Sequence, residues 1–344
     1  MKIFALPFFI CTFLFWSTSL WSVCLSPSGK NVTDKFDMLY QTRMLDQSDD
    51  FKELMQRLRE YTILLIPGID FDLMEEFYNG NRFQYVRKKL FRLFELRGHL
   101  QDYKDFFDEN NIQYKTLEVK DNHYANQTDK ITRITDLIKS TQGNIIFVAH
   151  SKGGVDIQAI MLHFLNANTP ADHRELAKIK GAIFLQAPFQ GSPFSDLYMK
   201  DESFFSHPVK SVIQTVFRKN SEHAESFSLA FRRAFNEKNK LSLQELNEKM
   251  NFLSFSTYVP RGSDNFRYPF FAYSRNAIYD HYKLDNDGLV PCGSAWPGSS
   301  FIIKKDIGHA RTIRKSTFWG KKQDIDRKKL FFSLIKIWFE QNQR

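Results

Sequence analysis

Short apolar runs recur along the chain, separated by breakers, polar loops and segments of a different periodicity. An apolar run of about four to eight residues without alternation is typical of a strand buried on both faces of a sheet. Runs of this kind and shorter apolar stretches predict strands over Tyr61–Ile66, Tyr114–Val119, Ile145–Ala149, Ile179–Leu185, Phe270–Ser274 and Ser300–Lys304.

Several segments between these runs carry apolar residues three and four positions apart, which is the spacing of one face of a helix. Because strands that alternate with helices form parallel sheets, the pattern predicts an α/β protein with a mostly parallel, doubly wound sheet. The helices are expected at residues 51–58, 100–107, 129–138 and 326–340, and directly after the run that ends at Ala149.

Residues 197–262 interrupt this alternation. The apolar clusters Val212–Phe217 and Phe227–Phe235 indicate an inserted, mainly helical amphipathic region. Two interpretations stay open. The region is either a pair of cap helices that packs on the core for stability, or a lid whose phenylalanine-rich face covers a pocket.

The N-terminus has the pattern of a secretory signal. Lys2 precedes the apolar block Ile3–Trp16, and small and polar residues follow at Ser17–Ser19. Residues 1–24 are therefore expected to form a signal peptide, cut after Ser19, Ser22 or Cys24, and residues 25–344 the exported domain. An uncleaved signal-anchor is the alternative, because the uncharged stretch is long enough to span a bilayer.

The chain has 344 residues and a formal net charge of +9, a size that suits one α/β core with insertions. The charge would suit an anionic membrane surface or nucleic acid. Its densest part, Arg311–Lys329, also holds acidic residues and indicates the solvated face of the last helix. No nucleic-acid-binding motif accompanies it, so nucleic acid is not an expected partner.

Three cysteines occur, Cys11, Cys24 and Cys292. The first two lie in the signal segment or at its edge, so the mature domain is expected to keep Cys292 alone. An exported protein without a disulfide framework depends on its core for stability.

The strongest chemical signal is the segment Ala149-His-Ser-Lys-Gly153, where a serine lies between a predicted strand and a predicted helix. A sharp strand–turn–helix with serine at its apex is a nucleophile elbow, and the tight turn requires small residues on both sides of the serine. Ala149 and Gly153 meet that requirement for Ser151. An ordinary strand with a glycine-rich loop is the alternative.

A serine nucleophile needs a base, and the base needs an orienting acid, in the chain order serine, acid, histidine. His309 follows the strand predicted at Ser300–Lys304, and Asp287 lies in a tight turn at the expected rim of the sheet. Asp285 is a nearby competitor for the acid, and Asp196 a more distant one.

The acidic turn Asp285–Gly288 superficially suggests a calcium loop. The spacing, however, would place Lys283 at the first ligand position of an EF-hand loop and Ser294 at the last, which excludes that motif. No cofactor and no metal ligand are expected at the candidate site, and a metal site elsewhere in the chain stays open.

Taken together, five segments resemble the secreted triacylglycerol lipases and esterases of the α/β-hydrolase superfamily. The resemblance covers roughly residues 61–311. It departs from the usual pattern at Ala149, where glycine is common, and at Pro67, where a histidine often precedes the oxyanion glycine. The segments are Ile66-Pro-Gly-Ile69, Ala149-His-Ser-Lys-Gly-Gly154, Ala187-Pro-Phe-Gln-Gly-Ser-Pro193, Asn286-Asp-Gly-Leu-Val-Pro291 and Gly308-His-Ala310.

The resemblance implies the α/β-hydrolase fold with an inserted helical cap or lid. It implies Ser151 as nucleophile, Asp287 as orienting acid and His309 as general base. It also implies an oxyanion hole formed by the backbone N–H groups of Ile69 and Lys152.

The expected activity is hydrolysis of lipid or other lipophilic carboxylic esters through an acyl-enzyme, without a cofactor. The expected partner is a lipid or lipophilic ester, met at a membrane or lipid–water interface. Two other functions stay open: transfer of the acyl group to an alcohol by the same residues, and lipid or partner binding without catalysis. The sequence does not indicate an oligomeric state.

Overall fold

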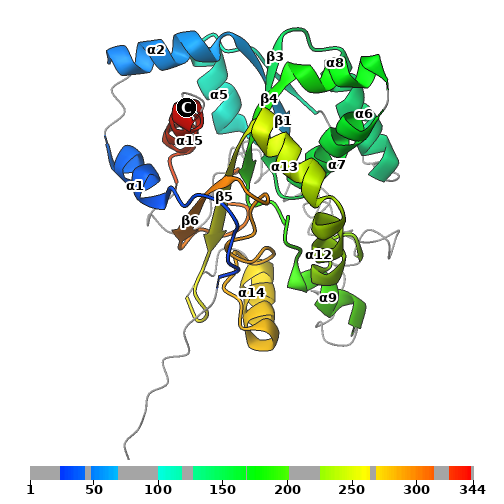
Figure 1. The fold of residues 1–344 in the computed structure, drawn as a ribbon. Coiled ribbons are helices and arrows are strands. Elements are labelled where there is room, and N and C mark those ends of the chain that lie inside the picture. The colour runs from blue at the N-terminus through cyan, green and yellow to red at the C-terminus, as the bar shows by residue number, and fades with distance from the viewer. Residues whose placement is uncertain are drawn as a thin grey trace, which may run out of the picture.

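A computed structural model describes residues 24–42, 48–68, 100–117, 127–167, 169–200, 225–263, 269–313 and 325–341. In this part of the chain, six parallel strands form one sheet in the order β2-β1-β3-β4-β5-β6, with helices on both faces (Figure 1). The predicted α/β architecture with a parallel sheet is confirmed. The strands are β1 (Tyr61–Ile66), β2 (Tyr114–Thr116), β3 (Asn144–His150), β4 (Ile179–Leu185), β5 (Asn251–Tyr258) and β6 (Ser300–Lys305).

The central strands send successive side chains into two separate cores. On β3, Phe147 belongs to the core on one face and Val148 to the core on the other. This alternation explains the continuous apolar runs, because side chains on both faces of a covered sheet must be apolar.

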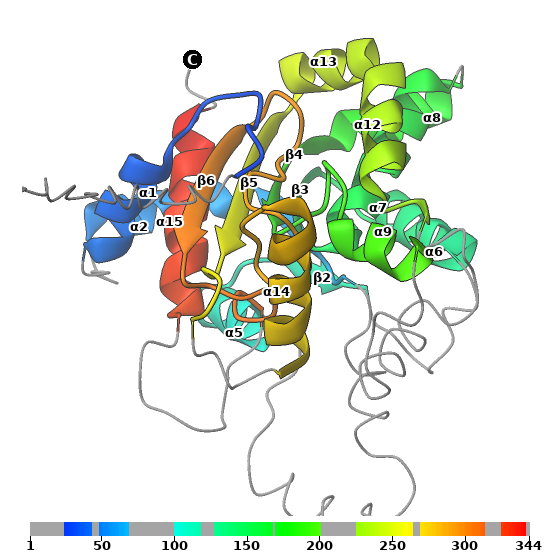
Figure 2. The ribbon, with the colours of Figure 1, turned by 90° about the horizontal axis from the view of Figure 1, so that it is seen from below.

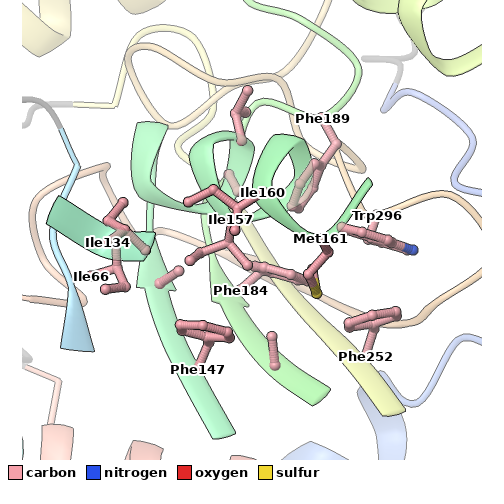
Figure 3. Close-up of a cluster of buried hydrophobic side chains, with 14 of the residues drawn as sticks. Ile66, Ile134, Phe147, Ile157, Ile160, Met161, Phe184, Phe189, Phe252 and Trp296 are labelled. Carbon is pink, nitrogen blue, oxygen red and sulfur yellow. The ribbon is translucent and has the colours of Figure 1, made fainter. Parts of the chain in front are cut away.

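The first core lies between the sheet and a layer built around α7. Figure 3 shows Ile157, Ile160 and Met161 of α7 next to Phe147 and Phe184 of the strands below. Full burial of each such side chain contributes about 1.5–3 kcal/mol. The helices of this layer are α6 (Gln127–Lys139), α7 (Lys152–Asn166), α8 (Pro170–Lys178), α12 (Leu229–Lys238) and α13 (Lys240–Lys249).

The second core lies on the opposite face, under α15. Leu330, Phe331, Leu334 and Trp338 of this helix are fully buried against the sheet. Figure 2 shows α1, α2 and α15 on the side of the sheet away from α7. The helices of this layer are α1 (Thr33–Gln41), α2 (Asp49–Leu58), α5 (Gln101–Glu109) and α15 (Arg327–Gln341).

The carboxyl ends of β1, β3 and β4 lie side by side. Ile66 pairs with Ala149 in the register of β1 and β3, and His150 pairs with Leu185 in that of β3 and β4. The residues that follow these three strands therefore meet at one edge of the sheet, where ligands bind in open α/β folds. The helices α9 (Pro193–Lys200) and α14 (Pro269–Tyr282) contact each other near this edge (Figure 1).

Two sequence-based expectations about secondary structure are wrong. Phe270–Ser274 is part of the helix α14, not a strand, and β5 lies inside the range 197–262 that was expected to be helical. The sequence did not predict β5, because serines interrupt its apolar run. Ser254 and Ser256 are buried there because their hydroxyls bond to Ser299 Oγ and Ser294 O, both at 3.0 Å. Within the described part of that range, α12 and α13 are helical as expected.

The expectation of a lone Cys292 is also wrong, because Cys24 and Cys292 form a disulfide across 268 residues of sequence. The segment that follows Cys24 continues along β6: Phe301 N donates to Lys30 O, and Val32 N to Phe301 O, each at 2.9 Å. A signal cut after Cys24 would remove one bonded cysteine, so the cuts after Ser19 and Ser22 are the compatible ones. The predicted signal peptide, residues 1–24, lies outside the described residues except for Cys24.

Among the described helices, none is both long and apolar enough to cross a membrane.

Candidate active site

Ser151 occupies a sharp turn between β3 and α7. Its backbone has φ 52° and ψ −127°, and its N–H donates to Leu185 O over 2.9 Å. A positive φ is costly for a residue with a Cβ and is held only when its surroundings demand it. The demand comes from close packing after the serine, since a Cβ on Gly153 would lie 2.7 Å from Ile66 O. This is the geometry of a nucleophile elbow.

His309 bridges Ser151 and Asp287. Its Nε2 lies 2.9 Å from Ser151 Oγ, and its Nδ1 lies 2.8 Å from Asp287 Oδ2. All three side chains are buried. Three residues chosen from the sequence, for their order in the chain and their expected places at the rim of the sheet, thus form one continuous hydrogen-bonded chain. The imidazole is placed to accept a proton from the hydroxyl.

The Asp287 carboxylate is fixed by several donors. Oδ1 accepts from Leu289 N at 3.0 Å and Val290 N at 2.8 Å, while Oδ2 accepts from Gln186 Nε2 at 3.0 Å. The backbone N–H of His309 also donates to Asp287 O over 2.9 Å, so acid and histidine are held together twice. Such contacts orient the carboxylate toward the imidazole without any need for movement.

The two competing acids make other contacts. Asp285 accepts a bond from Cys292 N at its backbone oxygen, 2.8 Å away, and Asp196 Oδ2 accepts from Leu229 N at 3.2 Å. In the described part of the chain, the carboxylate that contacts His309 is that of Asp287.

Two residues at the site were not foreseen from the sequence. His150 Nε2 lies 3.0 Å from His309 O, so the residue before the serine contacts the backbone of the histidine. Gln186, directly after β4, contacts Asp287 as described above. Its position at the carboxyl end of a strand next to β3 was a signal for a site residue, because such ends converge on one edge.

Of the two predicted oxyanion donors, the structure describes Lys152. Lys152 begins α7, whose first N–H groups have no partners within the helix and so suit an anion. Its side chain turns away to Asp156, 2.6 Å from Nζ to Oδ1. The loop after β1 approaches closely, since a Cβ on Gly68 would lie 2.7 Å from Ser151 Cβ. Ile69 lies outside the described residues.

Over the residues that the structure describes, no group of three or more His, Cys, Asp or Glu side chains is arranged to hold a metal ion.

No model of a known protein family and no curated protein sequence matches the chain. Similar solved structures are found. A metagenomic carboxyl esterase matches with a TM-score of 0.55 and 16% identity over 82% of this chain and 76% of that chain. The lipase of Staphylococcus hyicus matches with a TM-score of 0.53 and 11% identity over 83% and 96%. The mature lipase of Bacillus licheniformis matches with a TM-score of 0.51 and 13% identity over 81% and 91%.

The chain therefore has the α/β-hydrolase fold, the fold of these lipases and esterases. Identities this low show the fold alone.

Proposed function

We propose that this protein is a serine hydrolase of carboxylic esters with Ser151 as the nucleophile. The observation that carries the proposal is the continuous contact from Ser151 Oγ through His309 to Asp287 at the carboxyl edge of the sheet. The lipases and esterases of the same fold, cited above, support the reaction class.

The geometry suggests the order of steps. His309 Nε2 takes the proton of Ser151 Oγ as the oxygen attacks the ester carbonyl, and Asp287 stabilises the imidazolium that forms. The tetrahedral intermediate collapses, His309 gives the proton to the leaving alcohol, and the acyl group stays on Ser151. A water molecule, deprotonated by His309, then releases the carboxylic acid and restores the serine.

The oxyanion of the intermediate needs hydrogen-bond donors. We assign them to the backbone N–H groups of Lys152 and Ile69, each worth about 3 kcal/mol of transition-state stabilisation. The start of α7 at Lys152 supports the first assignment, and the approach of Gly68 to Ser151 supports the second.

A lipophilic ester is the proposed substrate. Helix α9 contacts α14 at the carboxyl edge of the sheet, and Leu229 N at the start of α12 donates to Asp196 of α9. These two helices expose large apolar side chains, Met199 (41% exposed) and Phe231 (40% exposed). Exposed apolar side chains around a site favour an acyl chain or a lipid–water interface over a polar substrate. The helical region around them is proposed as the cap or lid over the substrate.

Export through the N-terminal segment is part of the proposal. The disulfide between Cys24 and Cys292 supports it, because such bonds persist in oxidising compartments. N-terminal sequencing of the secreted chain tests it. Leu20 or Val23 is expected as the first residue, whereas a start after Cys24 contradicts the disulfide.

The activity is tested with the purified mature protein on p-nitrophenyl esters, triglycerides and phospholipids. Ser151→Ala should fold normally and lose turnover by more than about a thousandfold, as expected when a triad nucleophile is removed. Ser333→Ala is the matched control, because Ser333 is a buried serine on the opposite face of the sheet, whose Oγ donates to Lys329 O.

Labelling of Ser151 by a fluorophosphonate should accompany the activity and vanish in Ser151→Ala. Absence of both labelling and turnover in the wild-type protein rules the proposal out. Formation of a product ester in preference to free acid, when an alcohol acceptor is supplied, identifies an acyltransferase instead.

A further inference from the structure

A buried cluster of charged residues lies one helical turn from Ser151. Asp156 of α7 is almost completely buried, with Oδ1 2.6 Å from Lys152 Nζ and Oδ2 2.9 Å from Lys130 Nζ. Both lysine side chains are themselves more than nine-tenths buried. Buried ion pairs contribute little net stability compared with apolar residues of similar volume, so their place in the fold calls for another explanation.

Lys130 of α6 makes two further contacts, to the loop that follows β1. Its Nζ donates to Pro67 O at 2.9 Å and to Gly68 O at 3.3 Å. Pro67 has no backbone N–H, so the loop has one donor fewer with which to fix itself. The ammonium group of Lys130, which belongs to α6, holds the loop instead through the carbonyl oxygens of Pro67 and Gly68.

Gly68 O is the informative acceptor. Its residue lies directly beside the nucleophile, since a Cβ on Gly68 would lie 2.7 Å from Ser151 Cβ. A cation that holds Pro67 O and Gly68 O therefore fixes the described part of the loop after β1 against Ser151. The same cluster holds Lys152, whose own N–H is one of the two assigned oxyanion donors.

The Asp156 carboxylate stays charged at neutral pH. Burial by itself raises the pKa of the Asp156 carboxyl, but attraction to Lys130 and Lys152, with hydrogen bonds from both, lowers that pKa below its ordinary value. Asp156 thus remains an anion between the two lysines.

We propose that Lys130 and Asp156 are positioning residues for the oxyanion hole, with Lys130 fixing the loop after β1. Neither residue touches the reacting atoms. This inference rests on the proposed function. It adds the contacts that hold the loop at Pro67 and Gly68 in place.

The test compares Lys130→Met with Lys115→Met. Methionine keeps the length and apolar stem of lysine and removes the ammonium. Lys115 is the matched control, because its Nζ also donates to a carbonyl, Ser140 O at 2.9 Å, away from the site. Turnover is measured on a p-nitrophenyl ester and expressed per active site, counted by complete fluorophosphonate labelling.

In Lys130→Met we expect kcat to fall about ten- to a hundredfold with KM within about twofold, because a misplaced oxyanion donor weakens the transition state and not the bound substrate. A trifluoromethyl ketone, which forms an oxyanion on addition to Ser151, should bind more weakly by a similar factor. A merely structural role would lower the melting temperature and the number of labelled sites. It would leave kcat per labelled site and the affinity for the trifluoromethyl ketone unchanged.

Lys130→Arg is the second variant and keeps a cation beside Asp156. It should recover most of the stability and still lose at least about threefold in kcat, because a planar guanidinium cannot reproduce the bonds of one Nζ to two successive carbonyls. Wild-type kcat and inhibitor affinity in the folded lysine variants would overturn the inference while leaving the ester hydrolase intact. A wild-type protein that neither turns over esters nor labels at Ser151 would overturn both.

Discussion

Gln186 Nε2 donates to Asp287 Oδ2 over 3.0 Å, and the same carboxylate oxygen lies 2.8 Å from His309 Nδ1. The orientation of the glutamine amide is fixed, because Thr312 Oγ1 donates to Gln186 Oε1 at 2.6 Å. Gln186 also has a positive φ of 53°, so the turn after β4 directs its side chain into the site at some cost in backbone energy. The side chain is a fixed neutral donor to the proposed acid.

Replacement of Gln186 by methionine removes this donor at nearly constant volume. A hydrogen bond to a charged group contributes about 1.5–3 kcal/mol, so we expect kcat/KM to fall roughly ten- to a hundredfold. The measurement is kcat/KM between pH 5 and pH 9.

Gln190→Met is the control for this prediction. Gln190 lies four residues later, half-buried, and its amide contacts Ala295 O at 3.4 Å instead of Asp287. Its profile should superpose on that of the wild type. A Gln186→Met profile that does the same would show that the bond to Asp287 is unimportant for the reaction.

The start of α7 has no room for a methyl group at Gly153. A Cβ there would lie 2.7 Å from both Ile66 O and Pro67 O, which are backbone atoms and cannot rotate away. Gly153→Ala should therefore displace the loop after β1 or the elbow. We expect a loss of about 1–3 kcal/mol in unfolding free energy, as for other overpacked sites, and a fall of at least tenfold in kcat.

Gly308→Ala is the companion variant, next to His309 itself. Its Cβ would lie 3.6 Å from Asp287 O, an ordinary van der Waals contact, and its φ is not in the left-handed region. Stability and kcat close to the wild-type values are expected from urea unfolding and ester turnover. Equal damage in both variants would mean that crowding at Gly153 is not the cause.

The sequence predicted most of the strands because a sheet covered on both faces leaves continuous apolar runs, as in β3 and β4. It predicted Ser151 and His309 because each follows a strand of the sheet, β3 or β6. It predicted Asp287 from the chain order and the tight turn, although the strand expected before that turn is the helix α14. It missed β5, where Ser254 and Ser256 are buried with hydrogen-bond partners far away in the chain. Local periodicity carries no information about such partners.

The same limit applies to the remaining contacts of the site. Lys130 reaches Pro67 across 63 residues, and Gln186 reaches Asp287 across 101. Neither lies in a recognisable motif, since glutamine and lysine are common at strand ends and on helices for many reasons. Only the three-dimensional arrangement identifies the acceptors of these two side chains. It is likewise the three-dimensional arrangement that identifies Cys24 as the disulfide partner of Cys292.

That disulfide closes a loop of 268 residues and holds the segment after Cys24 near the turn of Asp287. Cys292→Ser should lower the unfolding free energy by about 2–5 kcal/mol, because the unfolded chain is no longer constrained. Urea unfolding with and without a thiol reductant provides the measurement. Reductant should bring the wild type down to the stability of the variant and leave the variant unchanged. A wild type that is insensitive to reductant would mean that the bond does not contribute to stability.

Asp156 gives a prediction in which the sign of the pH dependence follows from the pKa shift. Its folded-state pKa is lowered below the ordinary value, near 3.9 in an unfolded chain, by Lys130 and Lys152 against the opposing effect of burial. A lowered carboxyl pKa stabilises the folded protein above the unfolded-state pKa, and this stabilisation is lost as the pH falls through the folded-state value. Asp156→Asn should cost about 3–5 kcal/mol near neutral pH, because it leaves two buried lysines without their anion.

The difference in unfolding free energy between the wild type and Asp156→Asn should therefore be constant from about pH 7 to pH 5 and shrink below about pH 4. Urea unfolding at pH values from 3 to 7 measures it. Asp50→Asn is the control, because the pKa of Asp50 is also lowered, by its hydrogen bond to Lys336, but the carboxylate is exposed. Solvent screens that pair, so its loss should leave stability almost unchanged at every pH. A pH-independent difference for Asp156→Asn would mean that the carboxylate is not held as an anion between the two lysines.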